Sequence, residues 1–260
     1  MLASIDGVLM DSADATISLL DEGLLRGDGV FEVIRVYAGT PFALAEHLQR
    51  MSRSAASLRL AFDEDVVRAE AEALLGEGGA NDAALRLVVT RGGRRIGLLE
   101  PMKTFPDTIS LATITYSPTR VLDGVKSLSY GANMLATRLA KEASAEEALL
   151  VSPHGRVLEG PTTSFFYVLG GELCTPPLSD RILDSISRRV LLEVTDARER
   201  VTTLDDLASI SEAFLASSLR EVMAVRSIDE RTLDAAPGPV AIDAAAQVSA
   251  YIEAALRQTA

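Results

Sequence analysis

The chain has 260 residues and a net charge of −12 at neutral pH, and it carries 37 acidic against 25 basic residues. This length is enough to bury a substantial core, either as one large domain or as two smaller ones. The excess of acid argues against nucleic acid as a partner, because proteins hold phosphate backbones with clustered basic side chains. No apolar run approaches the length of a membrane span, so we expect small metabolites as partners and no membrane.

Cysteine and histidine are scarce in this chain. One cysteine, Cys174, allows no internal disulfide, and two histidines, His47 and His154, are too few for a histidine-rich metal site. The N-terminus lacks the basic start and the unbroken apolar stretch of a secretory signal. We therefore expect a cytoplasmic protein that works without a metal.

Residues 1–116 are predicted to form a small α/β domain. Alternating side chains predict a strand over 29–39, in which Glu32 and Ile34 face the same way. Apolar residues at helical spacing predict helices over 43–60 and 64–76. Further strands are expected at 3–10, 84–92 and 108–117. The two helices should cover the sheet that these strands form.

A stretch that contains proline and glycine, SPTRVLDG at 117–124, is predicted to link this domain to a larger one over 125–260. The periodicity of the second domain alternates between short strands and helices. Its expected strands are 125–130, 146–152, 156–160, 164–171, 172–177, 212–218 and 222–229, and its expected helices are 132–144, 184–195, 203–209 and 242–257.

Lysine chemistry has three candidates, because only Lys103, Lys126 and Lys141 are lysines. Lys126 stands in the strand-like segment VKSLSY, between apolar neighbours. Burial lowers the pKa of an amine, and the neutral amine is the form that attacks carbonyl carbon. Position alone favours the simpler interpretation, a solvated lysine at the end of a strand.

Acidic and hydroxyl side chains stand where the chain turns. Glu159 ends a hairpin strand immediately before Gly160, and a carboxylate there is suited to keep the ring nitrogen of a heterocycle protonated. Two hydroxyl clusters are suited to phosphate oxygens, and the first of them precedes a predicted helix. These clusters are Ser185, Ile186 and Ser187, and Ser217 with Ser218. Serines at helix starts also serve simply as caps, and a glutamate at a turn is often solvated.

Two long segments, 23–58 and 126–168, resemble the class IV (fold type IV) pyridoxal-phosphate aminotransferases, a family that includes transaminases for branched-chain amino acids, D-amino acids and R-amines, and aminodeoxychorismate lyases. The resemblance covers nearly the whole chain in the right order. It implies a two-domain α/β (α+β) fold, with a small N-terminal α/β domain and a larger C-terminal mixed β-barrel-like domain with helices. It also implies pyridoxal 5'-phosphate as cofactor and a homodimer with the active site between the domains and at the subunit interface.

The resemblance assigns a role to each candidate residue. Lys126 matches the catalytic lysine that forms a Schiff base with the cofactor, and Glu159 matches the carboxylate at the pyridine nitrogen. Arg50 matches a phosphate-binding arginine, and Tyr130 a tyrosine that bonds the phenolic oxygen in some members. The expected remaining cofactor ligands are Ser185, Ile186, Ser187, Ser217 and Ser218, although Ser185 replaces the usual glycine. Amino acids and 2-oxo acids are the implied substrates, converted in a ping-pong cycle.

Substrate choice depends on a few pocket side chains. At position 33, branched-chain enzymes usually carry glycine, whereas D-amino-acid enzymes carry valine, as this chain does. Val33 and Phe31, on the same predicted strand, are expected to contact the substrate. Arg26 stands where branched-chain enzymes have tyrosine, and arginine can bind a carboxylate through two parallel hydrogen bonds. The stretch TRGGRRIG adds further expected carboxylate ligands, Arg91 and Arg95, with Arg94 between them. The pattern resembles a D-amino-acid transaminase.

Several alternatives stay open at this point. An aminodeoxychorismate lyase would use the same lysine to eliminate pyruvate, and SSLREVMAV is faintly similar to its equivalent segment. A branched-chain L-amino-acid transaminase or an R-amine transaminase would share the fold and the cofactor. A protein that kept the fold without catalysis would have lost Lys126 or Glu159, and both are present.

Overall fold

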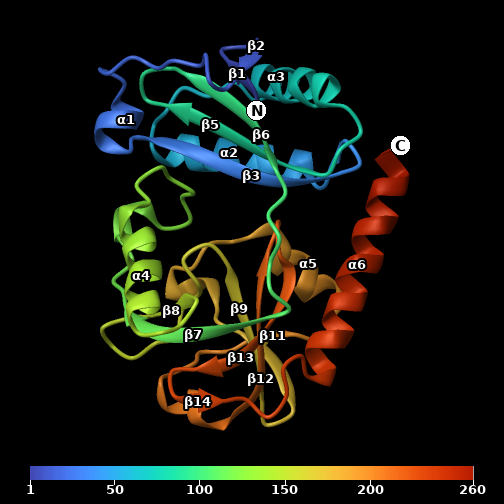
Figure 1. Cartoon of the computed structure of the whole chain (residues 1–260). Coiled ribbons are helices and arrows are strands. Elements are labelled where there is room, and N and C mark those ends of the chain that lie inside the picture. The colour runs from blue at the N-terminus through green and yellow to red at the C-terminus, as the bar shows by residue number, and fades with distance from the viewer. Residues whose placement is uncertain (260) are drawn as a thin grey trace. The chain divides into compact units, whose positions relative to one another are not determined.

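The computed structural model describes residues 1–259, and the chain forms two compact units (Figure 1). Unit 1 comprises Met1–Thr104, Val125–Tyr130 and the residues from Ala254 onward, and unit 2 comprises Phe105–Gly124 and Gly131–Glu253. These bounds differ from the expected ranges, because strand β7 (Thr108–Thr115) pairs with strands of unit 2. The predicted combination of a smaller N-terminal and a larger C-terminal α/β part is confirmed.

Unit 1 is built on an antiparallel sheet of six strands, in the order β2-β1-β6-β5-β3-β4. The strands are β1 (Leu2–Ile5), β2 (Val8–Asp11), β3 (Gly29–Tyr37), β4 (Thr40–Pro41), β5 (Ala83–Thr90) and β6 (Arg95–Pro101). Strand β6 was not expected, because Arg95, Gly97 and Glu100 interrupt the apolar alternation that marks a strand. It nevertheless pairs with β5 along seven residues.

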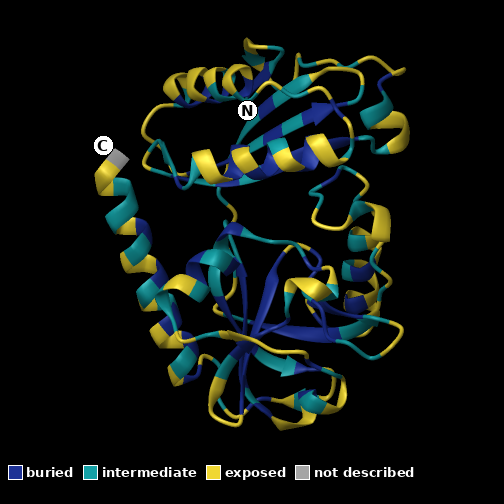
Figure 2. Cartoon of the chain, turned by 180° about the vertical axis from the view of Figure 1, so that it is seen from behind, coloured by how far each residue is buried: buried dark blue, intermediate teal, exposed yellow. Residues whose placement is uncertain are grey.

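Helices α2 (Leu44–Ser57) and α3 (Glu64–Gly78) agree with the predicted helices. Asp63 caps α3 by accepting hydrogen bonds from the backbone N–H groups of Asp65 and Val66. Each helix has a buried and an exposed side (Figure 2). The buried sides join alternate residues of β3 and β5 in one cluster, including Leu48, Met51, Leu74, Ile34 and Leu85. Full burial of such a side chain contributes roughly 1.5–3 kcal/mol, so this cluster fixes both helices on one face of the sheet.

Unit 2 is built on a mixed sheet of eight strands. Seven follow the order β11-β10-β9-β12-β13-β7-β8, and β14 pairs with β13. Strand β7 runs parallel to both of its neighbours, whereas most other pairs are antiparallel. The strands after β7 are β8 (Glu147–Val151), β9 (Ser164–Leu169), β10 (Glu172–Thr175), β11 (Arg198–Glu199), β12 (Ile210–Ser217), β13 (Glu221–Ile228) and β14 (Arg231–Thr232). The expected strand over 156–160 is reduced to a single bridge, between Val157 and Val151.

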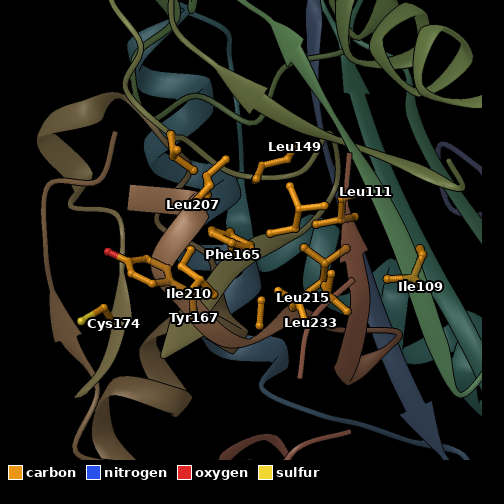
Figure 3. Packing of buried hydrophobic residues seen from close by; sticks show 14 of the residues in the cluster. Ile109, Leu111, Leu149, Phe165, Tyr167, Cys174, Leu207, Ile210, Leu215 and Leu233 are labelled. Carbon is orange, nitrogen blue, oxygen red and sulfur yellow. The ribbon is translucent and has the colours of Figure 1, made fainter. Parts of the chain in front are cut away.

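The core of unit 2 lies against this sheet and includes a parallel pair of rings, Phe165 and Tyr167, whose centroids are 5.4 Å apart (Figure 3). Cys174 is buried in the same cluster. The remaining helices are α1 (Glu22–Arg26) in unit 1, α4 (Gly131–Glu142) and α5 (Ile186–Val194) in unit 2, α6 (Pro239–Thr259), and 3-10 turns at Arg120–Leu122, Leu178–Asp180 and Asp205–Ser209. Across residues 1–259, no helix combines the length and apolarity needed to cross a membrane.

Candidate active site

The backbone of Lys126 is fixed against β3 and α2. The amide of Phe31 donates to the carbonyl oxygen of Lys126 at 3.2 Å, and the amide of Leu128 donates to that of Gly29 at 2.9 Å. The amide of Lys126 itself donates to the hydroxyl of Ser54, on α2, at 3.1 Å. The expected strand over 125–130 is thereby reduced to a short bridge at the start of β3. Because both backbone polar groups of Lys126 are bonded, its side chain leaves the backbone in a defined direction.

The amine of Lys126 lies beside two aromatic rings. Its Nζ is 4.5 Å from the ring centroid of Phe31 and 5.9 Å from that of Tyr130. The two rings meet edge to face, with centroids 5.2 Å apart and planes at 88°. This geometry is favourable for aromatic pairs, so each ring restrains the other. The amine therefore lies against an aromatic surface formed by these two rings.

Next to Phe31 in sequence, Glu32 forms a buried cluster with His47 and Arg50. Glu32 is fully buried and accepts hydrogen bonds from Arg50 Nε at 2.7 Å and Nη2 at 2.6 Å. His47 Nδ1 lies 2.8 Å from the second oxygen of Glu32. Burial alone would raise the pKa of Glu32, but the hydrogen bonds and charge of Arg50, with His47, hold it at about 2. Burial, the larger influence, lowers the pKa of His47 in spite of Glu32.

The sequence assigned Arg50 to phosphate but gave no role to Glu32 or His47. The signal was present, because the strand alternation places Glu32 on the same face as Ile34, which is in the core. A carboxylate on that face requires a buried partner. His47 and Arg50 are three residues apart on α2, on the same side of the helix, and both reach Glu32.

Two of the expected substrate-binding residues, Arg26 and Val33, lie in unit 1, Arg26 at the end of helix α1 and Val33 on strand β3. Arg26 ends α1, where 72% of its side chain is exposed and its Nε is 3.6 Å from Glu22 Oε1. Asp21 caps this helix and accepts a hydrogen bond from the Thr90 hydroxyl at 2.8 Å, so α1 is tied to β5. Val33 lies on β3, on the face opposite to Glu32 and next but one to Phe31.

The arginines of TRGGRRIG are engaged in ion pairs within unit 1. The pairs are Arg91 with Asp28, Arg94 with Asp6 and Arg95 with Glu70. Arg91 also donates to two backbone carbonyl oxygens that follow α2, at 2.7 and 2.6 Å. These three guanidinium groups therefore already have carboxylate partners within unit 1.

In unit 2, the structure brings Glu159 and the first hydroxyl cluster together. The amide of Leu150, on β8, donates to the carbonyl oxygen of Glu159 at 2.9 Å, which fixes its backbone. The Glu159 carboxylate accepts a hydrogen bond from the amide of Leu183 at 3.0 Å. Burial, followed by the negative charge of Glu159, raises the pKa of the Tyr116 phenol. Glu159 is thus an anchored negative charge that adjoins the loop leading into α5.

Ser185 is the N-cap of α5 and accepts a hydrogen bond from the amide of Arg188 at 3.1 Å. Its hydroxyl also lies 2.8 Å from that of Ser164, on β9. Ile186 and Ser187 form the first turn of the helix, where amide groups point toward the N-terminal end. Amides and hydroxyls at a helix start suit phosphate oxygens, and Glu159 suits a protonated ring nitrogen, so unit 2 fits a phosphorylated heterocycle.

Ser217 and Ser218 lie at the tight turn between β12 and β13. Ser217 ends β12 and pairs with Glu221, the first residue of β13. The Ser217 hydroxyl accepts a hydrogen bond from the amide of Arg220 at 3.2 Å. This bond uses one lone pair of the hydroxyl, so its O–H group can still donate to a ligand.

A sequence model of the family described as amino-transferase class IV matches residues 29–228 of this chain. The matched range includes Lys126 with its aromatic neighbours, Glu159 and both hydroxyl clusters. The chain belongs to the class IV aminotransferases.

The names of similar proteins include both branched-chain and D-alanine aminotransferases. A putative branched-chain-amino-acid aminotransferase of Methanocaldococcus jannaschii is 35% identical over 257 residues, which cover 88% of each chain. A D-alanine aminotransferase of Bacillus licheniformis is 32% identical over 259 residues, which cover 90% of this chain and 91% of the relative. A solved structure, the PLP-bound form of a hypothetical aminotransferase from Mycobacterium tuberculosis, is 27% identical with a TM-score of 0.88, over 97% of this chain and 99% of the other.

Proposed function

We propose that this class IV aminotransferase uses pyridoxal 5'-phosphate to move the amino group of a D-amino acid to a 2-oxo acid. The observation that carries the choice of substrate is Arg26, whose side chain is 72% exposed at the end of α1 and has only a loose contact, at 3.6 Å, with Glu22. A substrate α-carboxylate would gain a bidentate, charge-assisted pair there. Val33 on β3 supports the same choice, because it narrows the space beside Phe31 more than glycine would.

The residues divide the work on the cofactor. When bound, pyridoxal phosphate supplies an electron-withdrawing ring that makes the Cα–H bond of the substrate acidic. Lys126 Nζ would hold the aldehyde carbon of the cofactor and would accept a proton from the substrate Cα. Glu159 would keep a proton on the ring nitrogen, and Tyr130 would bond the phenolic oxygen, as the family resemblance implies. The residues that would hold the phosphate, as the family resemblance implies, are Arg50, Ser185, Ile186, Ser187, Ser217 and Ser218.

Glu32 supports this assignment of Arg50. A phosphate-binding arginine must hold its guanidinium in one orientation, and Glu32 fixes two of its nitrogens at 2.7 and 2.6 Å. His47 shares the second Glu32 oxygen with Arg50, and its lowered pKa favours the neutral imidazole at pH 7. The net charge of the cluster is then zero before phosphate arrives.

A branched-chain L-amino-acid transaminase is the second candidate, favoured by the 35% identity to the archaeal relative. A pyruvate-eliminating lyase on aminodeoxychorismate and an R-amine transaminase share the same lysine chemistry. We further propose a cytoplasmic homodimer in which Arg26 faces the active site of the neighbouring subunit, as the family resemblance implies.

The test is a half-reaction without an acceptor. Purified holoenzyme is mixed separately with D-alanine, D-glutamate, L-leucine, L-glutamate and R-1-phenylethylamine, and the absorption of the bound cofactor is followed as its aldehyde becomes an amine. Fast conversion by the D-amino acids alone is the expected result. Conversion by L-leucine and L-glutamate would establish the branched-chain candidate instead. Pyruvate release from aminodeoxychorismate, with no conversion by any donor, would establish the lyase.

A further inference from the structure

The turn between β12 and β13 adopts a backbone conformation that needs support. Three residues, Ser218, Leu219 and Arg220, connect Ser217 to Glu221. Glu221 has a φ of 55°, in the left-handed region that residues other than glycine seldom adopt. Such conformations persist when surrounding contacts determine them, and they concentrate at sites of function.

An ion pair beneath this turn supplies that support. Arg220 Nη1 bonds Glu147 Oε2, and the side chain of Glu147 is only 4% exposed. The Arg220 guanidinium carbon also lies 5.4 Å from the ring centroid of Phe105. The side chain of Arg220 is 19% exposed, so the pair is largely removed from water. In such surroundings a charge-assisted hydrogen bond from the guanidinium to the carboxylate restricts where the turn can lie.

The same carboxylate reaches a second turn, the one that follows Glu159. The hydroxyl of Thr163 donates to Glu147 Oε1 at 3.5 Å, and the amide of Gly160 donates to the carbonyl oxygen of Thr163 at 2.9 Å. A Cβ on Gly160 would lie 2.2 Å from the Thr163 hydroxyl and 3.3 Å from Glu147 Oε1, so the turn packs directly on this carboxylate. Glu147, on β8, therefore contacts both turns at once.

We propose that Arg220 is a positioning residue, which through Glu147 fixes the Ser217–Glu221 turn relative to the turn that carries Glu159. This inference rests on the proposed function in one respect, namely that the first turn binds the cofactor phosphate and the second its ring nitrogen. One rigid ligand must satisfy both turns, so their separation determines how well the phosphate is bound. An isolated surface ion pair would have no such effect.

The test compares pyridoxal phosphate with pyridoxal, which lacks the phosphate. Both compounds are titrated by absorption into full-length protein from which cofactor has been removed by dialysis. In Arg220→Met, which keeps most of the length of the side chain but removes the charge, we expect Kd for pyridoxal phosphate to rise about tenfold or more, a loss of about 1.4 kcal/mol or more. The Kd for pyridoxal should change less than about threefold. Equal weakening of both compounds, or of neither, would overturn the proposal.

A matched control lies next to this pair. Arg226, on β13, bonds Glu146 at 2.6 Å, and these side chains are 43% and 44% exposed. Arg226→Met should leave the ratio of the two dissociation constants unchanged. If the ratio of Kd for pyridoxal phosphate to Kd for pyridoxal rises as much in this variant as in Arg220→Met, the proposal is contradicted. The effect would then come from the loss of a positive charge and not from the position of the turn.

Two further variants keep the proposal testable if Arg220→Met is unstable. Arg220→Lys retains a cation without the fork and should weaken pyridoxal phosphate binding less than Arg220→Met does. Arg220→Met combined with Glu147→Leu removes both buried charges, and its melting temperature should recover while its affinity for pyridoxal phosphate stays low. Recovery of wild-type affinity in this double variant would overturn the proposal. The donor panel on wild-type protein tests the proposed function separately, because the affinity ratio does not depend on which amino acid is the substrate.

Discussion

The surroundings of Lys126 and those of Glu159 are built in different ways. Around Lys126, polar groups come from the middle of regular elements, since Glu32 lies within β3 and Arg50 within α2. Around Glu159, they come from turns and from the first turn of α5. Charges buried inside elements are locked to one another, whereas amides and hydroxyls at element ends remain suited to a ligand. Mutations in the two regions should therefore fail in different ways.

The largest expected effect is at Lys126 itself. Lys126→Ala should lower kcat by roughly 10⁴-fold or more, because it removes both the amine that binds the cofactor and the acceptor of the Cα proton. The visible absorption of the bound cofactor should be lost together with turnover. Lys141→Ala, which changes an exposed lysine on α4, is the control and should keep both. Turnover that survives Lys126→Ala would remove this residue from the mechanism.

Glu159→Gln should lower kcat by roughly 10²- to 10³-fold, because a neutral amide no longer holds a proton on the ring nitrogen. The same variant can also be tested in the protein without cofactor, through the pKa of Tyr116. Since the charge of Glu159 helps to raise the pKa of Tyr116, that pKa should fall in the variant. Tyrosine absorption, titrated with pH and compared between wild type, Glu159→Gln and Tyr116→Phe, measures the shift. An unchanged titration would mean that the Glu159 charge does not act on Tyr116.

Changes in the cluster of Glu32, His47 and Arg50 should instead lower the free energy of unfolding. The pKa of Glu32 is about 2 when folded and roughly 4.3 when unfolded, so its stabilising contribution is present above about pH 5 and is lost as pH falls toward 2. Urea unfolding at pH 7 and pH 3 should show a loss of about 2 kcal/mol from this group. The lowered pKa of His47 acts in the same direction, because the unfolded state gains that proton first.

Glu32→Gln should remove the Glu32 part of this acid sensitivity while lowering stability at pH 7. Glu64→Gln is the control, because Glu64 forms a partly exposed pair with Arg68 on α3 at 2.8 Å. Its effect should stay below about 1 kcal/mol at either pH. The same pH dependence in wild type and Glu32→Gln would contradict the assignment.

The smallest effect is expected at Arg26, at the exposed end of α1. Arg26→Ala should raise KM for D-amino acids about tenfold, since one charge-assisted pair contributes roughly 1.5 kcal/mol or more. KM for R-1-phenylethylamine, which has no carboxylate, should barely change. Arg53→Ala, an exposed arginine of α2, is the control and should affect neither. Equal losses for both donors in Arg26→Ala would indicate a structural role.

Regular periodicity explains which parts of this fold were predictable. Helices α2 and α3 were expected because their apolar residues recur at helical spacing, and the structure confirms them. Strand β6 escaped prediction because its pairing with β5 is specified by the neighbouring strand and not by its own composition. The sequence around Lys126 predicts a strand, but this segment pairs with β3 only through the bridge between Val30 and Ser127 and two neighbouring backbone hydrogen bonds.

In the candidate site too, the residues specified by local sequence were predictable, and those specified by packing were not. Local sequence pointed to Glu159 and to Ser185, because turns and helix caps are specified over a few neighbouring residues. The Glu32, His47 and Arg50 contacts depend on how a helix packs across a strand 15 to 18 residues away. Arg91 illustrates the limit, because its partners lie 63 and 33 residues away in sequence. Nothing in TRGGRRIG identifies them.

The ion pairs described above draw their cations from arginine, and this has a consequence for chemical selectivity. An aldehyde reacts with any accessible neutral amine, but guanidinium groups stay protonated and do not react in this way. Besides Lys126, the side-chain amines are those of Lys103 and Lys141, both exposed. A stability framework made of arginine therefore leaves an aldehyde cofactor few competing nucleophiles, and borohydride trapping followed by peptide mapping would have only these three lysine side chains to distinguish.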